Sequence, residues 1–171
     1  RTRPGNYVVK FLVRDAETGR MRTYQTAFAI PNLNREEKRL PISTVVLANQ
    51  RVPLGSELFS VRNSGTQNVG NPLIHDGQKL LPSVTRVFST SQDLYVFLQA
   101  YERNAVDTTL PLVAFASFYQ GDVKVFETEP VPIVDGLNPR SKAVPIGMTV
   151  PLSSLAPGRY DIQVTVIEPS G

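Results

Sequence analysis

The sequence predicts an all-β protein. Apolar and polar residues alternate with a period of two along most of the 171 residues, which is the pattern of half-buried strands. The 14 prolines and 11 glycines interrupt this pattern at short intervals, as expected for short strands joined by turns. Helical signals are confined to Arg35–Leu40 and Ser153–Leu155, which are too short for more than about a turn each. Together these observations favour an antiparallel β-sandwich over a large barrel.

The composition is that of a globular chain and excludes several classes of site. Apolar residues make up 41% and charged residues 19%, which is enough to bury a core. The absence of cysteine excludes disulfides, thiolate nucleophiles, iron–sulfur clusters and cysteine-ligated zinc. The basic residues behind the net charge of +3 are scattered in pairs, so no nucleic-acid footprint is expected, and no apolar run reaches the ~18 residues that span a membrane. Because the chain begins at Arg1 and not at Met, we expect it to be a processed or excised fragment.

Residues 7–30 predict a β-hairpin. The first strand carries apolar side chains at alternate positions, namely Tyr7, Val9, Phe11 and Val13. Turn-forming residues follow at Asp15–Gly19, and a second alternating run over residues 20–30 includes Tyr24 and Phe28.

Further strands are expected at about residues 42–48, 84–89, 93–101, 112–119, 123–128, 143–150 and 159–167. The segment Gln120–Asp122 predicts a tight hairpin turn between two of them. Pro145 and Pro151 lie at either end of another, and because proline cannot donate to a ladder we expect an edge strand there.

A repeated motif links the two ends of the chain. Residues 4–19 read PGNYVVKFLVRDAETG and residues 157–171 read PGRYDIQVTVIEPSG. Aligning them pairs Pro4 with Pro157, Gly5 with Gly158, Tyr7 with Tyr160, Val9 with Ile162, Phe11 with Val164 and Val13 with Val166. The match covers turn residues, polarity and strand length together, so the two segments are predicted to be equivalent.

The shared Pro-Gly-x-Tyr pattern predicts a tyrosine corner. Proline and glycine form a turn into a strand, and the tyrosine at its start buries its ring while its hydroxyl reaches a backbone group near the turn. In immunoglobulin-like and fibronectin type III-like sandwiches this strand is the penultimate one, and a last strand follows it. The first copy has that follower, residues 20–30, whereas the sequence stops where the follower of the second copy is expected.

These features divide the chain into three parts. Residues 1–31 are the hairpin equivalent to the last two strands of a sandwich, residues 32–41 are a polar linker, and residues 42–171 are a sandwich without its own last strand. Such a sandwich exposes unpaired backbone. Three arrangements fill or leave the gap: residues 20–30 of the same chain, the same segment of a neighbouring chain, or an open groove. Strand exchange between copies, repeated head to tail, gives an open filament.

Three segments carry a resemblance to a known family: residues 4–33, residues 71–102, which contain PSVTRVF followed by LYV, and residues 150–171. Together they resemble the region downstream of the von Willebrand factor A-type domain in the VWFA-related proteins of Acidobacteria. The resemblance implies an exported, extracellular, periplasmic or cell-surface, multidomain protein without an established activity. The Asp-x-Ser-x-Ser motif of that A domain is absent from this sequence, so metal-dependent adhesion is not carried over.

The residues do not predict an enzyme. His75 is the only histidine, and its neighbour Asp76 points the other way on an extended chain, so a Ser–His–Asp triad is not expected. One histidine without cysteine does not make a zinc site, and Asp76–Gly77 and Asp135–Gly136 are read as turns and not as calcium loops. Phosphate-binding glycine loops are also absent, and a glycosidase is left with carboxylates but no motif. We expect no cofactor and no metal.

Aromatic side chains supply the remaining candidates for a binding surface. In residues 93–101 one face holds Leu94, Val96, Leu98 and Ala100, and the other holds Tyr95, Phe97, Gln99 and Tyr101. Core or subunit packing is favoured for these rings over a carbohydrate platform. The possible interface residues are Tyr24, Phe28, Tyr95, Phe97 and Tyr101. The sequence therefore predicts a non-enzymatic structural or protein-interaction module that binds itself or a neighbouring domain, with a polysaccharide-binding module as the alternative.

Overall fold

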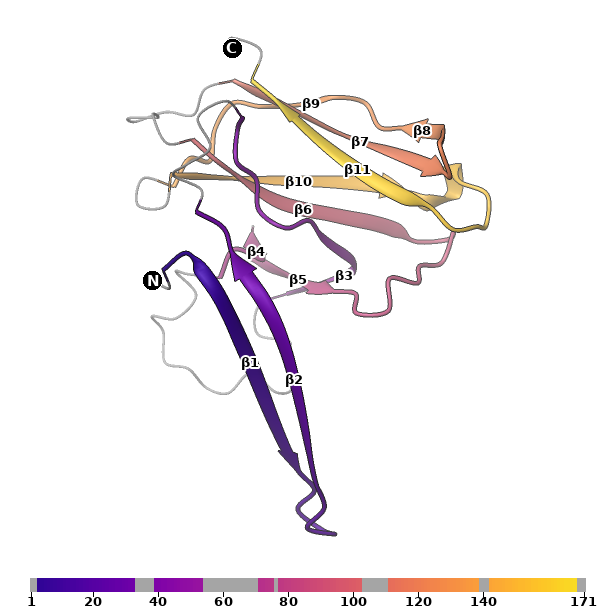
Figure 1. The fold of residues 1–171 in the computed structure, drawn as a ribbon. Helices are drawn as coiled ribbons and strands as arrows, with labels where there is room; N and C mark the ends of the chain where they lie inside the picture. Colours follow the sequence, from indigo (N-terminus) through magenta and orange to yellow (C-terminus); the bar gives the residue numbers. More distant parts are fainter. Residues whose placement is uncertain are drawn as a thin grey trace. The chain divides into compact units, whose positions relative to one another are not determined.

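The computed structural model describes residues 3–32, 39–53, 71–75, 77–102, 111–138 and 142–168 (Figure 1). The predicted all-β class is confirmed, because every strand pairing in these residues is antiparallel and none of them lies in an α-helix. The chain divides into two compact units, Arg1–Arg39 and Leu40–Gly171.

The first unit is the hairpin that the sequence predicts. Strand β1 (Gly5–Arg14) pairs with β2 (Met21–Ile30) without a break in register, from Gly5 opposite Ile30 to Arg14 opposite Met21. The Asp15 carboxylate organises the turn by accepting hydrogen bonds from the Glu17 amide at 2.9 Å and from the Thr18 hydroxyl at 2.7 Å. The Thr18 hydroxyl, with the backbone amides of Glu17 and Thr18, lowers the pKa of Asp15.

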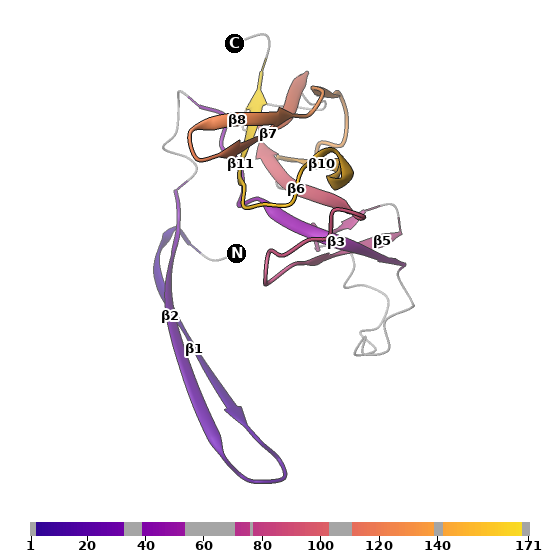
Figure 2. The ribbon, with the colours of Figure 1, turned by 90° about the vertical axis from the view of Figure 1, so that its right-hand side faces the viewer.

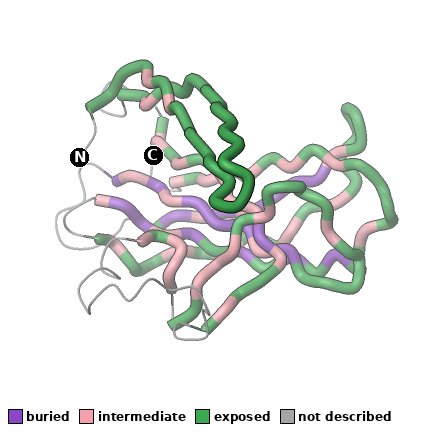
Figure 3. Tube along the Cα trace, turned by 90° about the horizontal axis from the view of Figure 1, so that it is seen from below, coloured by how far each residue is buried: buried purple, intermediate pink, exposed green. Residues whose placement is uncertain are grey.

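The two strands of this hairpin contain no buried residue. All of their residues are exposed except Tyr7, Val9 and Ile30, which are half-buried (Figure 3). Large apolar side chains are among the exposed ones: Val8, Phe11, Leu12, Val13, Met21, Tyr24 and Phe28. A two-stranded hairpin on its own is marginally stable in water, so this unit presents apolar surface that further packing would cover.

The second unit consists of two sheets that share one core (Figures 1 and 2). The first sheet has the order β10-β6-β3-β5-β4, with bounds Ala143–Pro151, Asp93–Tyr101, Val46–Pro53, Gln78–Pro82 and Ile74–His75. The second has the order β11-β7-β8, with bounds Asp161–Ile167, Leu112–Gln120 and Val123–Glu127, and β9 (Val131–Ile133) also pairs with β7. A short 3-10 helix, η3 (Leu152–Ser154), follows β10.

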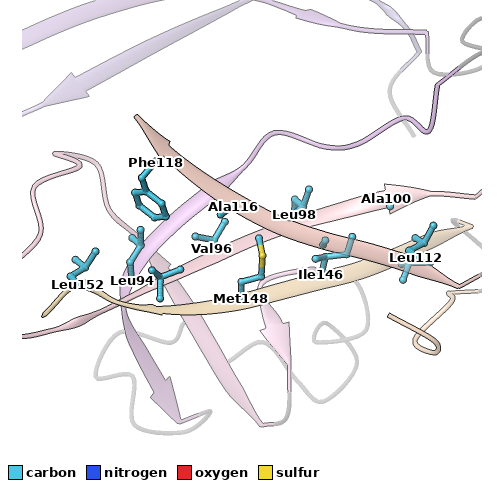
Figure 4. Close-up of a cluster of buried hydrophobic side chains, with 13 residues drawn as sticks. Leu94, Val96, Leu98, Ala100, Leu112, Ala116, Phe118, Ile146, Met148 and Leu152 are labelled. Atoms are coloured by element: carbon cyan, nitrogen blue, oxygen red, sulfur yellow. The ribbon is translucent and has the colours of Figure 1, made fainter. Parts of the chain in front are cut away.

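The core lies between the inner faces of β6, β7 and β10. Figure 4 shows side chains of β7 pointing into the same layer as those of β6 and β10. The cluster consists of Leu94, Val96, Leu98, Ala100, Leu112, Ala114, Ala116, Phe118, Val144, Ile146, Met148, Val150 and Leu152. Alternate positions of each strand supply these side chains, as the period-two pattern requires.

Most predicted strands of the second unit are present, with shifted ends. The turn at Gln120–Asp122 is confirmed, because Gln120 pairs with Val123 and Gly121 adopts φ +59°. The edge strand expected between Pro145 and Pro151 is also confirmed, because β10 lies at the end of its sheet in the described part of the chain. The strand expected at 42–48 begins at Val46, while Ile42 makes only an isolated bridge to Ala100. The short strands β4, β5 and β9 were not predicted from the pattern.

The prediction of a strand at residues 84–89 is wrong, because the structure has no strand there. The Ser83 hydroxyl oxygen accepts a hydrogen bond from the Arg86 amide at 3.1 Å, and Arg86 adopts φ +54°. The alternating pattern is therefore overridden by a local side-chain turn, which competes with ladder pairing. As a result Val84 is 95% exposed and Val87 is 75% exposed. Of the two expected helical stretches, Arg35–Leu40 lies mostly outside the described residues, and Ser153–Leu155 corresponds to η3.

The contrast between the two units gives a direct test of where stability resides. Leu98 is 0% exposed in the core, whereas Leu12 of the hairpin is 66% exposed. We expect Leu98→Ala to lower the free energy of unfolding by about 2–5 kcal/mol, because it leaves a cavity in the shared core. The matched variant Leu12→Ala should change it by less than about 0.5 kcal/mol. Urea denaturation followed by circular dichroism measures both, and equal losses would contradict this assignment of the core.

Candidate functional site

Strand β11, which contains the second copy of the repeat, lies at the edge of its sheet. Among the described residues it pairs with β7 alone, over Asp161 opposite Tyr119 to Ile167 opposite Val113. Figure 1 shows β11 alongside β7, on the side of β7 away from β8. The other edge of β11 is therefore the candidate site.

The direction of the backbone N–H and C=O groups at this edge follows from the hydrogen bonds on the opposite side of β7. The Ala116 carbonyl accepts from the Thr128 amide at 2.9 Å, and the Ala116 amide donates to the Thr128 hydroxyl at 3.0 Å, so both groups of Ala116 point away from β11. Because backbone direction alternates along a strand, Phe115 and Ser117 point towards β11 and bond to their partners there. The intervening β11 residues point the other way. The N–H and C=O groups of Ile162, Val164 and Val166 thus face outward from the sheet.

The side chains of Ile162, Val164 and Val166 face the core but leave it partly accessible to solvent. Ile162, Val164 and Val166 pack against the buried cluster and remain half-buried, whereas Ala114, Ala116 and Phe118 of β7 are buried.

A pocket of about 920 Å³ opens beside this edge. Tyr160 and Ile162 line it from the β11 side, and Val45 and Leu47 line it from the β3 side, with Phe118 and Phe88 also on its wall. The pocket therefore lies between the two sheets at the start of β11, beside the edge where β11 lacks a partner among the described residues.

The repeat motif adopts the same local geometry in both copies. The Tyr7 hydroxyl donates to the carbonyl of Arg3 at 2.5 Å, and the Tyr160 hydroxyl donates to the carbonyl of Ala156 at 2.6 Å. In each copy the tyrosine ring lies over the motif's glycine, where a Cβ built on Gly5 or on Gly158 would be 3.6 Å from the ring. Both are tyrosine corners of the kind that the sequence motif predicts. Pro4 and Pro157 precede these glycines, outside the strands.

The two copies also correspond in the direction of their backbone N–H and C=O groups. The Asp15 amide donates to the Arg20 carbonyl, so alternation along β1 directs the backbone groups of Phe11, Val9 and Tyr7 towards β2. These residues align with Val164, Ile162 and Tyr160 in the repeat. The edge of β1 that pairs with β2 is therefore equivalent to the edge of β11 that faces away from β7.

The predicted aromatic residues fall into two groups. Tyr24 and Phe28 are exposed on the hairpin, where Phe28 stacks on Tyr7 at 5.8 Å between ring centroids. In β6, Phe97 is buried, while Tyr95 and Tyr101 are half-buried. Arg51 lies 4.0 Å above the Tyr95 ring, so that ring has a cation–π partner within the same unit.

The structure describes only some of the residues considered for catalysis or metal binding. His75 lies at the end of β4, and Asp76 is outside the described residues. In the described part of the chain, no group of three or more His, Cys, Asp and Glu residues is placed to hold a metal ion. Within the same residues, no helix has the length and apolar character needed to cross a membrane.

The sequence predicted a strand over the residues of β11 but did not predict the pocket beside it. Val45, Leu47 and Phe88 come from segments distant in the sequence and meet Tyr160 only through the packing of two sheets. Their apolar character was the only local signal, and it did not indicate which edge they would line.

Comparisons with models of protein families, with curated proteins and with solved structures find no match to this chain.

The two tyrosine corners provide a matched pair of variants. We expect Tyr160→Phe to lower the free energy of unfolding of the second unit by about 1 kcal/mol, because it removes the hydrogen bond to Ala156. Tyr7→Phe removes the equivalent bond from the hairpin, which belongs to the other unit, and should leave this transition unchanged. Urea denaturation of both variants checks the expectation. A loss caused by Tyr7→Phe as large as that caused by Tyr160→Phe would contradict it.

Proposed function

We propose that this chain is a non-enzymatic protein-interaction module whose β11 edge accepts a strand from a protein partner. The observation that carries the proposal is the edge of β11 that no strand of the described residues occupies, beside an open pocket, together with its equivalence to the edge of β1 that pairs with β2. Addition of a strand to an exposed edge is a general mode of protein recognition.

The topology supports an immunoglobulin-like or fibronectin type III-like sandwich. In such a fold the first, second and fifth strands share one sheet, and the third and sixth strands lie in the other with the last strand beside the sixth. Strands β3, β6 and β10 fit the first set in the order β10-β6-β3, and β7 and β11 fit the second. The tyrosine corner at Tyr160 marks β11 as the sixth strand, so the position beside it that the described residues leave without a strand is that of the last strand.

A bound strand would satisfy two requirements at once. Its backbone would pair with the outward N–H and C=O groups of Ile162, Val164 and Val166. Its inward side chains would cover the half-buried faces of these residues and fill part of the pocket of about 920 Å³. Backbone pairing supplies affinity in this mode, and the pocket supplies selectivity for particular side chains.

The polysaccharide-binding alternative has no comparable support. A sugar platform uses exposed aromatic faces, which occur on the hairpin at Phe11, Tyr24 and Phe28 but at no described residue of the second unit, where the pocket lies. A role in an exported multidomain protein agrees with the resemblance to the region downstream of a von Willebrand factor A-type domain.

A synthetic strand tests the proposal. The peptide RMRTYQTAFAIPN, which copies residues 20–32, carries the pattern that already pairs with the first copy of the repeat. We expect it to bind the 171-residue chain and to shift the backbone amide resonances of Ile162, Val164 and Val166. Nuclear magnetic resonance titration locates the binding, and fluorescence anisotropy of a labelled peptide gives the dissociation constant.

Backbone methylation provides the matched control. In the pairing of β1 with β2, alternation directs the amides of Tyr24 and Thr26 towards the partner strand and the amide of Gln25 away from it. A peptide N-methylated at Thr26 should bind at least about tenfold more weakly, which corresponds to about 1.4 kcal/mol, whereas methylation at Gln25 should have a much smaller effect. Equal effects, or resonance shifts that spare β11, would rule out strand addition at this edge.

A further inference from the structure

We infer that the strand accepted by β11 is β2 of a second copy of this chain, with Phe28 opposite Tyr160. This inference rests on the proposed function and adds to it the identity of the partner and the register of the pairing. The internal repeat, the exposed hairpin and the chemistry of the pocket carry it together.

The register follows from superposing the two copies of the motif. In the hairpin, Tyr7 is opposite Phe28 and Phe11 is opposite Tyr24. Replacing each β1 residue by its β11 equivalent puts Tyr160 opposite Phe28 and Val164 opposite Tyr24. The same substitution places Gln163 opposite Gln25, with both side chains on the outer face of the sheet, where Gln163 and Gln25 are exposed.

In this register the residues of β2 that face the core side are Phe28, Thr26, Tyr24 and Arg22. Phe28 stacks on Tyr7 in the hairpin, and beside Tyr160 the same ring would enter the pocket that Tyr160 lines with Phe118 and Val45. Phe118 already contacts Tyr160 edge to face at 6.5 Å, so a third ring extends an existing aromatic cluster. Phe28 is 45% exposed and Tyr24 is 65% exposed in the hairpin, and both rings would lose exposed area on transfer.

Moving β2 from β1 to β11 costs little free energy in the hairpin. Strand β2 leaves β1, in a unit whose strands contain no buried residue, and gains β11, which packs against the core of the second unit. The number of strand pairings is conserved, while the buried apolar area increases. An isolated hairpin is marginal in water, so the cost of opening it is small.

The direction of the strand favours a second copy over the same chain. In this register Ile30 is opposite Gly158, which lines the pocket together with Leu94 at the start of β6. The chain re-enters the sandwich at Pro41, whose carbonyl accepts from the Tyr101 amide at the other end of β6. Residues 31–40 of the same chain would have to run back along β6 over about 23 Å, which is about two-thirds of the roughly 33–36 Å that ten residues span when fully extended. A strand from a second copy has no such constraint, and its repetition head to tail forms an open assembly.

Disulfide trapping tests both the partner and the register, because the chain has no cysteine of its own. The variants Gln25→Cys and Gln163→Cys of the 171-residue chain are mixed under mild oxidation. Their positions form a pair without backbone hydrogen bonds in the proposed ladder, which falls within the Cα separation that a disulfide requires. We expect the mixed dimer to form at least tenfold faster than in the control mixture of Ala29→Cys with Gln163→Cys, which lies four residues out of register.

The outcomes separate this inference from the proposed function. Equal rates in the two mixtures would overturn the inference. An internal disulfide in the double variant Gln25→Cys/Gln163→Cys, with no mixed dimer from the single variants, would assign the strand to the same chain and would also overturn it. If the β2 peptide binds to the β11 edge but no specific mixed dimer forms, the inference fails and the proposed function stands. If the peptide does not bind there, both fail.

Discussion

The pairing of backbone N–H and C=O groups between neighbouring strands is the constraint on which the organisation of this protein depends. Strands β6 and β7 have partners on both sides, and their inner faces form most of the buried core. Strand β11 has β7 on one side, and the described residues place no strand on the other. Its backbone direction, its half-buried side chains and the pocket beside it follow from that one position in the sheet.

The two tyrosine corners separate local structure from tertiary structure. Each forms a hydroxyl-to-carbonyl bond four residues back along the chain and places a tyrosine ring over a glycine. The geometry is the same although Tyr7 belongs to a solvated hairpin and Tyr160 to a packed sandwich. The motif is therefore specified by residues close in sequence, and what surrounds it does not alter it. This independence makes the corner a useful marker of equivalent strands.

The hairpin lacks a core for its apolar side chains, and β11 lacks a strand of the described residues along one edge. The proposed assembly supplies both. The hairpin has a complete backbone ladder but exposed apolar side chains such as Phe11 and Tyr24. Strand β11 packs against a core but has outward backbone groups along one edge. Transfer of β2 to β11 would give the exposed aromatic rings a core and the outward backbone groups a ladder. The driving force is burial of apolar surface, and the backbone pairing sets the register.

The sequence by itself determined the all-β class, the first hairpin, the turn at Gly121 and both tyrosine corners. These features depend on alternation and turn chemistry within a few residues. It did not determine β4, β5 and β9, which are too short to show a pattern, and it misassigned residues 84–89, where the Ser83 side chain forms a turn. Only the tertiary structure decided that Val45 and Leu47 line a pocket with Tyr160, because sheet packing brings together residues more than a hundred positions apart. Such contacts leave no periodic signal in the chain.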